Sequence, residues 1–284
     1  MKALAIKLAA VAALLAAGTA QAQAPTGGAP AAGAPAAAAP ARQPRYIEPT
    51  AYDFNNNAGW TSMFDGKTLA GWDGPKDIWR VENGAIVTSD VASNPKPLGP
   101  VYMAWVGKDG GDLKDFEFKA EIKLEGERAN SGLQFRALML GKTEKLRSEY
   151  ESFGYQADFD FGNEQTGALI ECCSGPRRGP SPRPYRASKG MSIEVTQAAP
   201  NGILLGTIGD AEELKKAIRV GDWNQLHVVV RGQSMFYYMN GRLMSAVVDE
   251  DPTRLLSHGR LLIQLEGGGD RKVSYRNLWL KTLP

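Results

Sequence analysis

The sequence predicts an all-β fold in which two antiparallel sheets pack as a sandwich. Three observations support this prediction: one long run of strict period-two alternation, two Asn-Gly pairs between β-prone runs, and many short strand-like segments beside a single helical one. Alternation is typical of a strand with one buried face, Asn-Gly is typical of a tight hairpin, and many short strands with little helix favour a sandwich.

The alternating run covers residues 115–124, and its apolar and charged side chains separate onto opposite faces of a strand. The apolar face holds Phe116, Phe118, Ala120, Ile122 and Leu124, and the other face holds Glu117, Lys119, Glu121 and Lys123. Asn83-Gly84 and Asn240-Gly241 predict two-residue hairpins, because both residue types tolerate the positive φ of a type I′ turn. Further strands are expected at Tyr102–Val106, Gly132–Leu138, Tyr155–Phe161, Ala168–Cys172, Ser192–Thr196, Gln225–Arg231, Leu261–Glu266 and Lys272–Lys281.

One short helix is expected at Ala211–Ile218. Asp210 can accept hydrogen bonds from the free N–H groups of its first turn, and Glu213 can return one to the backbone as a capping box.

The N-terminus predicts export and a tether. Lys2 and Lys7 flank the start of the apolar run 8–17, and Ala20-Gln21-Ala22 fits a signal-peptidase site. Residues 1–22 are therefore expected to be a signal peptide. The alternatives are cleavage after Ala20 and retention of the segment as an anchor helix. Residues 23–45, rich in Ala, Pro and Gly, have little to bury and are expected to form a linker. The remaining residues, 46–284, are expected to form one domain, in the periplasm or outside the cell.

Composition excludes several classes of protein. The two cysteines and two histidines are too few for a zinc finger or a multi-histidine metal centre. Without Lys2 and Lys7, 31 of the 33 Lys and Arg residues remain against 31 Asp and Glu, so no nucleic-acid partner is expected. No membrane span is expected after the leader.

Polar side chains recur on several predicted strands. Any one of them is explained by the wet face of an antiparallel strand. As a set, they predict one polar concave face, on which amide, guanidinium and carboxylate groups bind sugar hydroxyls. By alternation we expect Gln134 to share a face with Arg136, Gln156 with Asp158, and Gln264 with Glu266, while Glu171 closes its own strand.

The sequence does not decide whether a cofactor binds or which aromatic residue contacts a sugar. No cofactor is required, but residues 158–163 resemble the start of a calcium loop that has Leu169 at its twelfth position, so a divalent cation is an alternative. Cys172 and Cys173 are either bonded or two buried thiols. His227 is expected to be a half-buried strand residue. Trp60, Trp72, Trp79 and Trp279 are expected to serve packing, although one of Trp72, Trp105 or Trp223 could line a sugar-stacking surface.

Several ordered motifs resemble the 3-keto-disaccharide hydrolase domain family, over about residues 59–283. They are Gly59-Trp-Thr-Ser-Met-Phe64-Asp65-Gly66-Lys67-Thr68-Leu69-x-Gly71-Trp72, Trp79-Arg-Val-Glu-Asn83-Gly84, Asn130-Ser-Gly132-x-x-Phe-Arg136, Gly154-Tyr-Gln156-Ala-Asp158, Gly221-Asp-Trp223-Asn224, Asn240-Gly241, Gly259-x-Leu-Leu-Ile-Gln264-Leu and Tyr275-Arg-Asn277-Leu-Trp-Leu-Lys281. The resemblance implies a concanavalin A-like jelly roll that acts on glycosides oxidised to a ketone at C3. It also implies a partner oxidoreductase that makes the ketone.

The chemistry that this resemblance implies is elimination. The ketone acidifies the C2 proton, a carboxylate removes it, and the aglycone leaves C1, with or without later hydration. The roles expected are Asp158 or Glu171 as the base, Arg136 as the oxyanion stabiliser, and Gln134, Gln156, Gln264 and Glu266 as substrate contacts. Many family members carry a histidine where this chain has Glu266, and others a glutamate where it has Gln156. A lectin-like module without catalysis and a two-carboxylate glycosidase are the alternatives.

Overall fold

The computed structural model describes residues 50–89, 100–107, 110–141, 151–173, 181–266 and 271–284. The predicted signal peptide and linker therefore lie outside the described residues. The chain divides into two units, Met1–Thr50 and Ala51–Pro284, and the second holds every element described below. It consists of two sheets and one short helix, which confirms the all-β prediction.

The larger sheet has ten strands, ordered β12-β11-β15-β14-β13-β6-β17-β4-β3, with β1 paired to β17. Its strands are β1 (Thr61–Ser62), β3 (Trp79–Glu82), β4 (Ala85–Ser89), β6 (Phe116–Glu125), β11 (Met191–Val195), β12 (Ile203–Thr207), β13 (Asn224–Arg231), β14 (Ser234–Met239), β15 (Arg242–Asp249) and β17 (Lys272–Thr282). One pair, β11 with β15, is parallel, and the other named strand pairs are antiparallel, as predicted.

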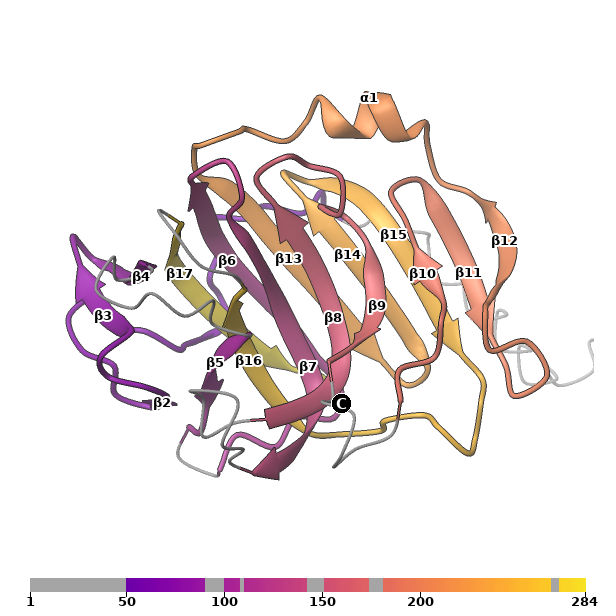
Figure 1. The fold of residues 1–284 in the computed structure, drawn as a ribbon, viewed down its shortest axis with the longest axis horizontal. Coiled ribbons are helices and arrows are strands. Elements are labelled where there is room, and N and C mark those ends of the chain that lie inside the picture. The colour runs from indigo at the N-terminus through magenta and orange to yellow at the C-terminus, as the bar shows by residue number, and fades with distance from the viewer. Residues whose placement is uncertain (1–49, 90–99, 108–109, 142–150, 174–180, 267–270) are drawn as a thin grey trace, which may run out of the picture. The chain divides into compact units, whose positions relative to one another are not determined.

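The smaller sheet has seven strands, ordered β10-β9-β8-β7-β16-β5-β2. Its strands are β2 (Trp72–Asp73), β5 (Val101–Trp105), β7 (Asn130–Gly141), β8 (Glu151–Asp160), β9 (Leu169–Cys172), β10 (Arg186–Ala187) and β16 (Arg260–Leu265). In Figure 1, β7 to β10 of this sheet lie in front of β6 and β13 to β15 of the larger one.

The core fills the space between the sheets. The alternating strand β6 buries its predicted apolar face there, opposite Phe135, Tyr155 and Phe159 of the smaller sheet. Both predicted Asn-Gly hairpins are confirmed, because Asn83, Gly84, Asn240 and Gly241 all have positive φ. Strands β1, β2, β10 and β12 were not predicted; three of them have only two residues, too few to show a period.

Helix α1 (Ala211–Lys215) is shorter than predicted and connects β12 to β13 across one end of the sandwich (Figure 1). Asp210 caps it as expected by accepting from the N–H groups of Glu212 and Glu213. The side chain of Glu213 bonds Lys216 rather than completing a capping box. No helix among the described residues is long and apolar enough to cross a membrane.

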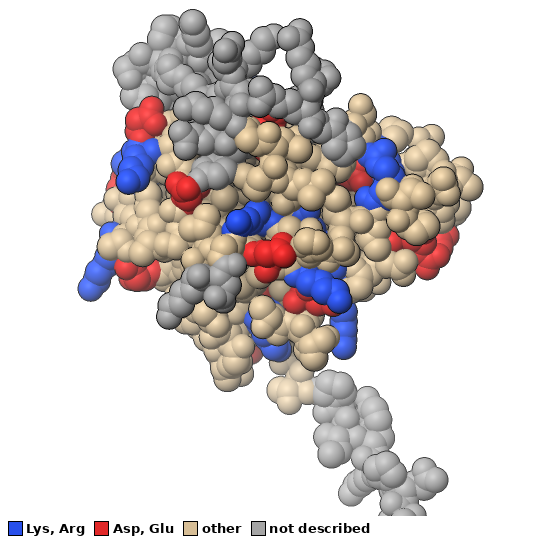
Figure 2. All heavy atoms as spheres, turned by 90° about the horizontal axis from the view of Figure 1, so that it is seen from below, with Lys and Arg blue, Asp and Glu red and all other residues tan. Residues whose placement is uncertain are grey.

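Basic and acidic side chains are interspersed on the described surface that Figure 2 shows. No large field of one sign is visible on that face, in agreement with the near-neutral composition of residues 23–284.

Candidate functional site

The polar side chains predicted from the sequence meet largely on one face of the smaller sheet. We call this the outer face; it is the face turned away from the larger sheet. Strand register aligns Gln156 with Gln134, and Asp158 with Gly132. The neighbouring strands add Gln264, which is opposite Tyr102. Because paired residues of antiparallel strands point to the same side, these residues share the outer face, while Leu133, Tyr155 and Ile263 point into the core.

A chain of hydrogen bonds joins the outer-face groups. Gln156 Nε2 donates to Asp158 Oδ1 at 2.8 Å and to Gln264 Oε1 at 3.2 Å. Gln264 Nε2 in turn donates to the Tyr102 hydroxyl at 3.0 Å. All four residues are buried, so the bonds hold the side chains in fixed positions and strengthen one another in a region of low dielectric.

Gln134 is held beside this chain by two contacts. Its Nε2 donates to the Cys172 carbonyl at 2.6 Å, and its Oε1 accepts from the hydroxyl of Ser152. The amide of Gln134 is therefore used within the protein, although the residue is paired with Gln156 in the strand register.

Burial raises the pKa of Asp158 to about 7 from an ordinary 3.8. The hydrogen bond from Gln156 and the charge of Arg186 act against this rise, and the charges of Glu266 and Asp160 add to it. Among the described residues, no hydrogen bond reaches the second carboxylate oxygen of Asp158. A carboxyl that titrates near neutrality, with one oxygen held by Gln156, suits a general base.

Glu266 lies at the same end of the outer face, bridged to Asn130 by the backbone. Burial raises the pKa of Glu266, and the positive charge of Arg271 acts against that rise. Arg271 donates from Nη1 to the Glu266 carbonyl at 3.0 Å. Among the described residues, the buried Arg271 Nε and the buried Asn130 Oδ1 have no hydrogen-bond partner, so this corner holds a donor and an acceptor that the described fold does not use.

Arg136 does not reach the outer face, and the prediction that it shares a face with Gln134 is wrong. The residue has a φ of +47°, and the β7–β8 register shifts between Phe135 and Leu138. Such a bulge inverts the alternation on which the prediction depended. The guanidinium instead pairs with Asp115 at 2.9 Å and donates to the carbonyls of Lys114, Gly232 and Leu256.

Glu171 also lies on the other side of the sheet. It is paired with Tyr155, whose ring is in the core, so its carboxylate points away from Asp158. There it accepts from the backbone N–H and the guanidinium of Arg183. Arg183 also contacts Asp249 and Asp251, which makes Glu171 part of a buried ion cluster.

Four residues at or beside this face were not predicted from the sequence: Tyr102, Ser152, Arg186 and Arg271. Tyr102 stands in an apolar run, so nothing in the pattern marked its hydroxyl. Arg186 is on a two-residue edge strand, where its pairing with Ile170 places it in the row of Gln156. No local sequence pattern marks either of them, because only the strand register brings them to the site.

In the segment that resembles a calcium loop, the carboxylate of Asp160 is used within its own turn. Asp160 accepts hydrogen bonds from the N–H groups of Glu164, Gln165 and Thr166 and so closes the turn after β8. Within the described ranges, no three His, Cys, Asp or Glu residues are grouped to hold a metal ion. Cys172 and Cys173 are paired as a disulfide, and Cys173 Sγ lies 3.9 Å from Gln156 Oε1.

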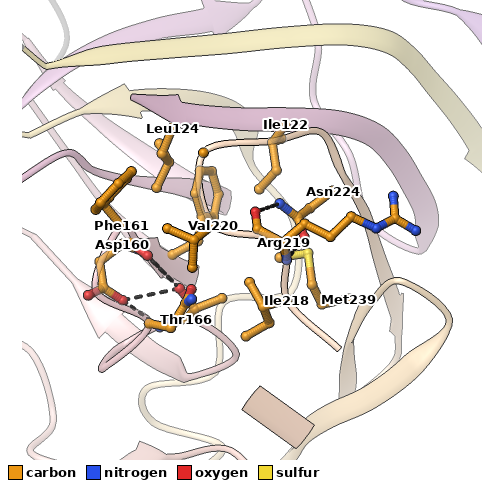
Figure 3. A pocket seen from close by; sticks show the side chains of 13 residues that line it. Ile122, Leu124, Asp160, Phe161, Thr166, Ile218, Arg219, Val220, Asn224 and Met239 are labelled. Atoms are coloured by element: carbon orange, nitrogen blue, oxygen red, sulfur yellow. Dashed lines mark hydrogen bonds between the residues drawn. The ribbon is translucent and has the colours of Figure 1, made fainter. Parts of the chain in front are cut away.

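A separate pocket opens between the β8–β9 turn and the connection that follows α1 (Figure 3). Its labelled side chains are mostly apolar, among them Leu124, Phe161 and Val220. The polar groups drawn there bond one another: Asn224 donates to the Arg219 carbonyl, and Thr166 to Asp160. With its polar atoms satisfied in this way, the pocket offers little to a polar ligand.

Residues 59–281 match the family model of the 3-keto-alpha-glucoside-1,2-lyase-like domain. The match covers both sheets and every outer-face residue named above. No curated protein matches the chain.

Solved structures with a similar arrangement have low sequence identity. A candidate glycosyl hydrolase from Parabacteroides distasonis is 16% identical, with a TM-score of 0.47 over 80% of this chain and 95% of that one. A legume lectin-like domain from Entamoeba histolytica is 12% identical, with a TM-score of 0.46 over 83% and 100%. A carbohydrate binding module from Bacillus subtilis is 13% identical, with a TM-score of 0.39 over 75% and 96%.

Proposed function

This chain belongs to the family of 3-keto-alpha-glucoside-1,2-lyase-like domains, and we propose that it cleaves glycosides whose C3 hydroxyl has been oxidised to a ketone. The observation that supports this most is the carboxyl of Asp158, which titrates near pH 7 within a row of amide and hydroxyl groups. The amides suit sugar hydroxyls, and the carboxyl suits the removal of a carbon-bound proton.

The proposed reaction starts at C2. The C3 ketone acidifies the C2 proton, and Asp158 removes it while the electron pair moves onto the ketone oxygen as an enolate. The enolate then re-forms the ketone, a C1–C2 double bond forms, and the C1–oxygen bond breaks. The aglycone takes up one proton as it leaves. Addition of water across the new double bond gives net hydrolysis.

The enolate requires positive charge or hydrogen-bond donors near its oxygen. Arg136, which was expected to have this role from the sequence, is not assigned to it, because its guanidinium pairs with Asp115 on the other side of the sheet. We assign the role to Arg186 and Arg271. The charge of Arg186 acts on Asp158, and the buried Nε of Arg271, near Glu266, has no partner within the part of the chain that the structure describes. A divalent cation could serve the same purpose, but no step is assigned to one.

The test compares a 3-keto-glucoside with its unoxidised parent. The protein is expected to release aglycone from the oxidised compound only. Asp158→Asn should lower turnover by about a thousandfold or more, because the general base is lost, while Glu266→Gln should lower it about tenfold. A larger loss of turnover in Glu266→Gln than in Asp158→Asn would identify Glu266 as the general base. Sugar binding without product formation would favour the lectin-like alternative.

We also propose that the protein acts after export, beside an enzyme that oxidises the C3 hydroxyl of glycosides. The support is the leader-like sequence at residues 1–22 and the need for an oxidised substrate. Protein recovered from the periplasm or medium of a bacterial host should have the intact mass of residues 23–284. A mass that includes residues 1–22 would contradict cleavage.

A further inference from the structure

A second hollow lies at the far end of β5, away from the outer face. It has about 1350 Å³ of empty space, part of it open to solvent, and Trp105 lines it. Tyr102, on the same strand, belongs to the outer face, whereas Trp105 is three residues further on and so points to the opposite side. None of the outer-face residues lines this hollow.

Glycine backbone holds the indole of Trp105 in place. A Cβ on Gly71 would lie 2.6 Å from Trp105 Cζ3, and a Cβ on Gly107 would lie 2.9 Å from Nε1. Only glycine allows the chain to approach the ring this closely. The ring of Trp72 closes another side, edge-on at 5.3 Å between centroids. The indole is therefore positioned before any ligand arrives.

Trp105 is also the best placed of the three tryptophans considered for sugar stacking. Trp72 is buried and donates from Nε1 to the Met63 carbonyl at 2.7 Å. The guanidinium of Arg276 lies over the ring of Trp223, with 4.1 Å between its central carbon and the ring centroid. A cation therefore already covers this face of the Trp223 ring. Trp105 lines open space instead.

Polar groups rim the hollow. The carboxylate of Asp112 is largely exposed and accepts from His258 Nδ1 at 2.9 Å. Thr61 and Ser62 are exposed on β1 and line the same space. An indole beside a carboxylate and hydroxyl groups matches a sugar ring, which offers an apolar C–H surface edged by hydroxyls.

We propose that this hollow is a second carbohydrate site, which binds a neutral sugar residue against Trp105 and Asp112. It does not depend on the chemistry assigned to Asp158. A site of this kind would hold an unoxidised sugar residue of a longer glycan while an oxidised residue of the same glycan is cleaved at the outer face. It would also serve to tether the protein to such a glycan.

The experiment measures binding of unoxidised methyl α-glucoside and maltose by calorimetry and ligand-observed NMR. Ala70 is exposed and lines the hollow, so Ala70→Trp should fill it without touching the core and weaken binding at least tenfold. Ala198→Trp, at an exposed turn between β11 and β12, should bind as the unchanged protein does. Asp158→Asn should also keep this binding, even where it abolishes turnover.

Two results would overturn the proposal: no binding of either sugar at tens of millimolar, or binding that Ala70→Trp leaves intact. If Ala70→Trp does not fold, Asp112→Ala provides the second variant, because the side chain is exposed and its loss spares the core. It should weaken binding at least threefold, and unchanged affinity would refute the site. Turnover of a 3-keto-glucoside by Ala70→Trp reports on the proposed function separately.

Discussion

At the residue scale, the properties of Asp158 come from its surroundings rather than from its place in a motif. Burial raises its pKa from 3.8 to about 7, while the Gln156 amide holds one oxygen and limits the rise. A carboxylate on a wet strand face would titrate near its ordinary value and would be a weak base toward carbon.

The pKa of Asp158 predicts how activity depends on pH. The base must be ionised, so kcat/KM for a 3-keto-glucoside should rise about tenfold per pH unit below pH 7 and level off above it. A pH–rate profile measured from pH 5 to pH 9 checks this. An acid limb near pH 4 would show that Asp158 is not the base or is not buried in solution.

The same shift links stability to pH with a defined sign. Because the folded pKa lies above 3.8, the folded state keeps the proton longer, so this contribution to stability is fully present below pH 3.8 and is lost as pH rises through about 7. The loss amounts to about 4 kcal/mol at most. The side chain of Asp158→Asn never ionises. The unfolding free energy of this variant, relative to that of the unchanged protein, should therefore increase as the pH rises from 5 to 8.

At the element scale, β7 is shaped to admit the Gln156 side chain. Gly132 is opposite Asp158, and a Cβ at this position would lie 2.6 Å from Gln156 Cδ. The φ of Gly132 is not in the left-handed region, so the glycine is needed for space rather than for backbone conformation. The strand thus keeps a gap into which the amide fits.

Gly132→Ala tests this fit. The added methyl should displace the Gln156 amide from Asp158 and Gln264, and lower turnover by roughly ten- to a hundredfold through misplacement. Since the bond from Gln156 lowers the pKa of Asp158, its loss should also move the acid limb of the pH–rate profile to higher pH. Steady-state kinetics over the pH range measures both effects.

Gly206→Ala is the matched control. Gly206 is also a strand glycine, on β12, but a Cβ there meets no atom within 4 Å. It should leave both the rate and the pH profile unchanged. Equal losses in the two variants would mean that strand glycines matter here for the backbone and not for the amide of Gln156.

At the scale of the whole domain, a buried ion cluster joins the two sheets. Arg183 contacts Glu171 of β9 in the smaller sheet and Asp249 of β15 in the larger one, and Tyr155 donates to Asp249. All of these side chains are buried. A cluster of this kind fixes the position of one sheet against the other, since each charge depends on its partners to offset its lost hydration.

Arg183→Met should destabilise the domain by about 3 to 5 kcal/mol, because the buried carboxylates of Glu171, Asp249 and Asp251 would lose the guanidinium that they share. Urea unfolding followed by tryptophan fluorescence measures the change. Arg80→Met removes an exposed pair with Glu82 and should cost about 1 kcal/mol or less. A loss for Arg183→Met no greater than that of Arg80→Met would show that the cluster does not hold the sheets together.

The strand pattern and the family could be predicted from the order of the amino acids alone. The alternation of β6 and the Asn-Gly turns depend only on residues that are neighbours in the sequence, so both could be predicted from it. Gln156, Asp158 and Gln264 could also be named, because each lies in a regular strand where counting by two gives the correct face.

Other features of the site depend on how the strands are arranged in space. The bulge at Arg136 reversed its side chain, and the pairing of Glu171 with Tyr155 turned its carboxylate to the ion cluster. Tyr102 joined the site because β5 lies beside β16, far away in sequence. The face on which a side chain lies, its burial and its pKa all depend on which strands become neighbours, and no local pattern contains that information.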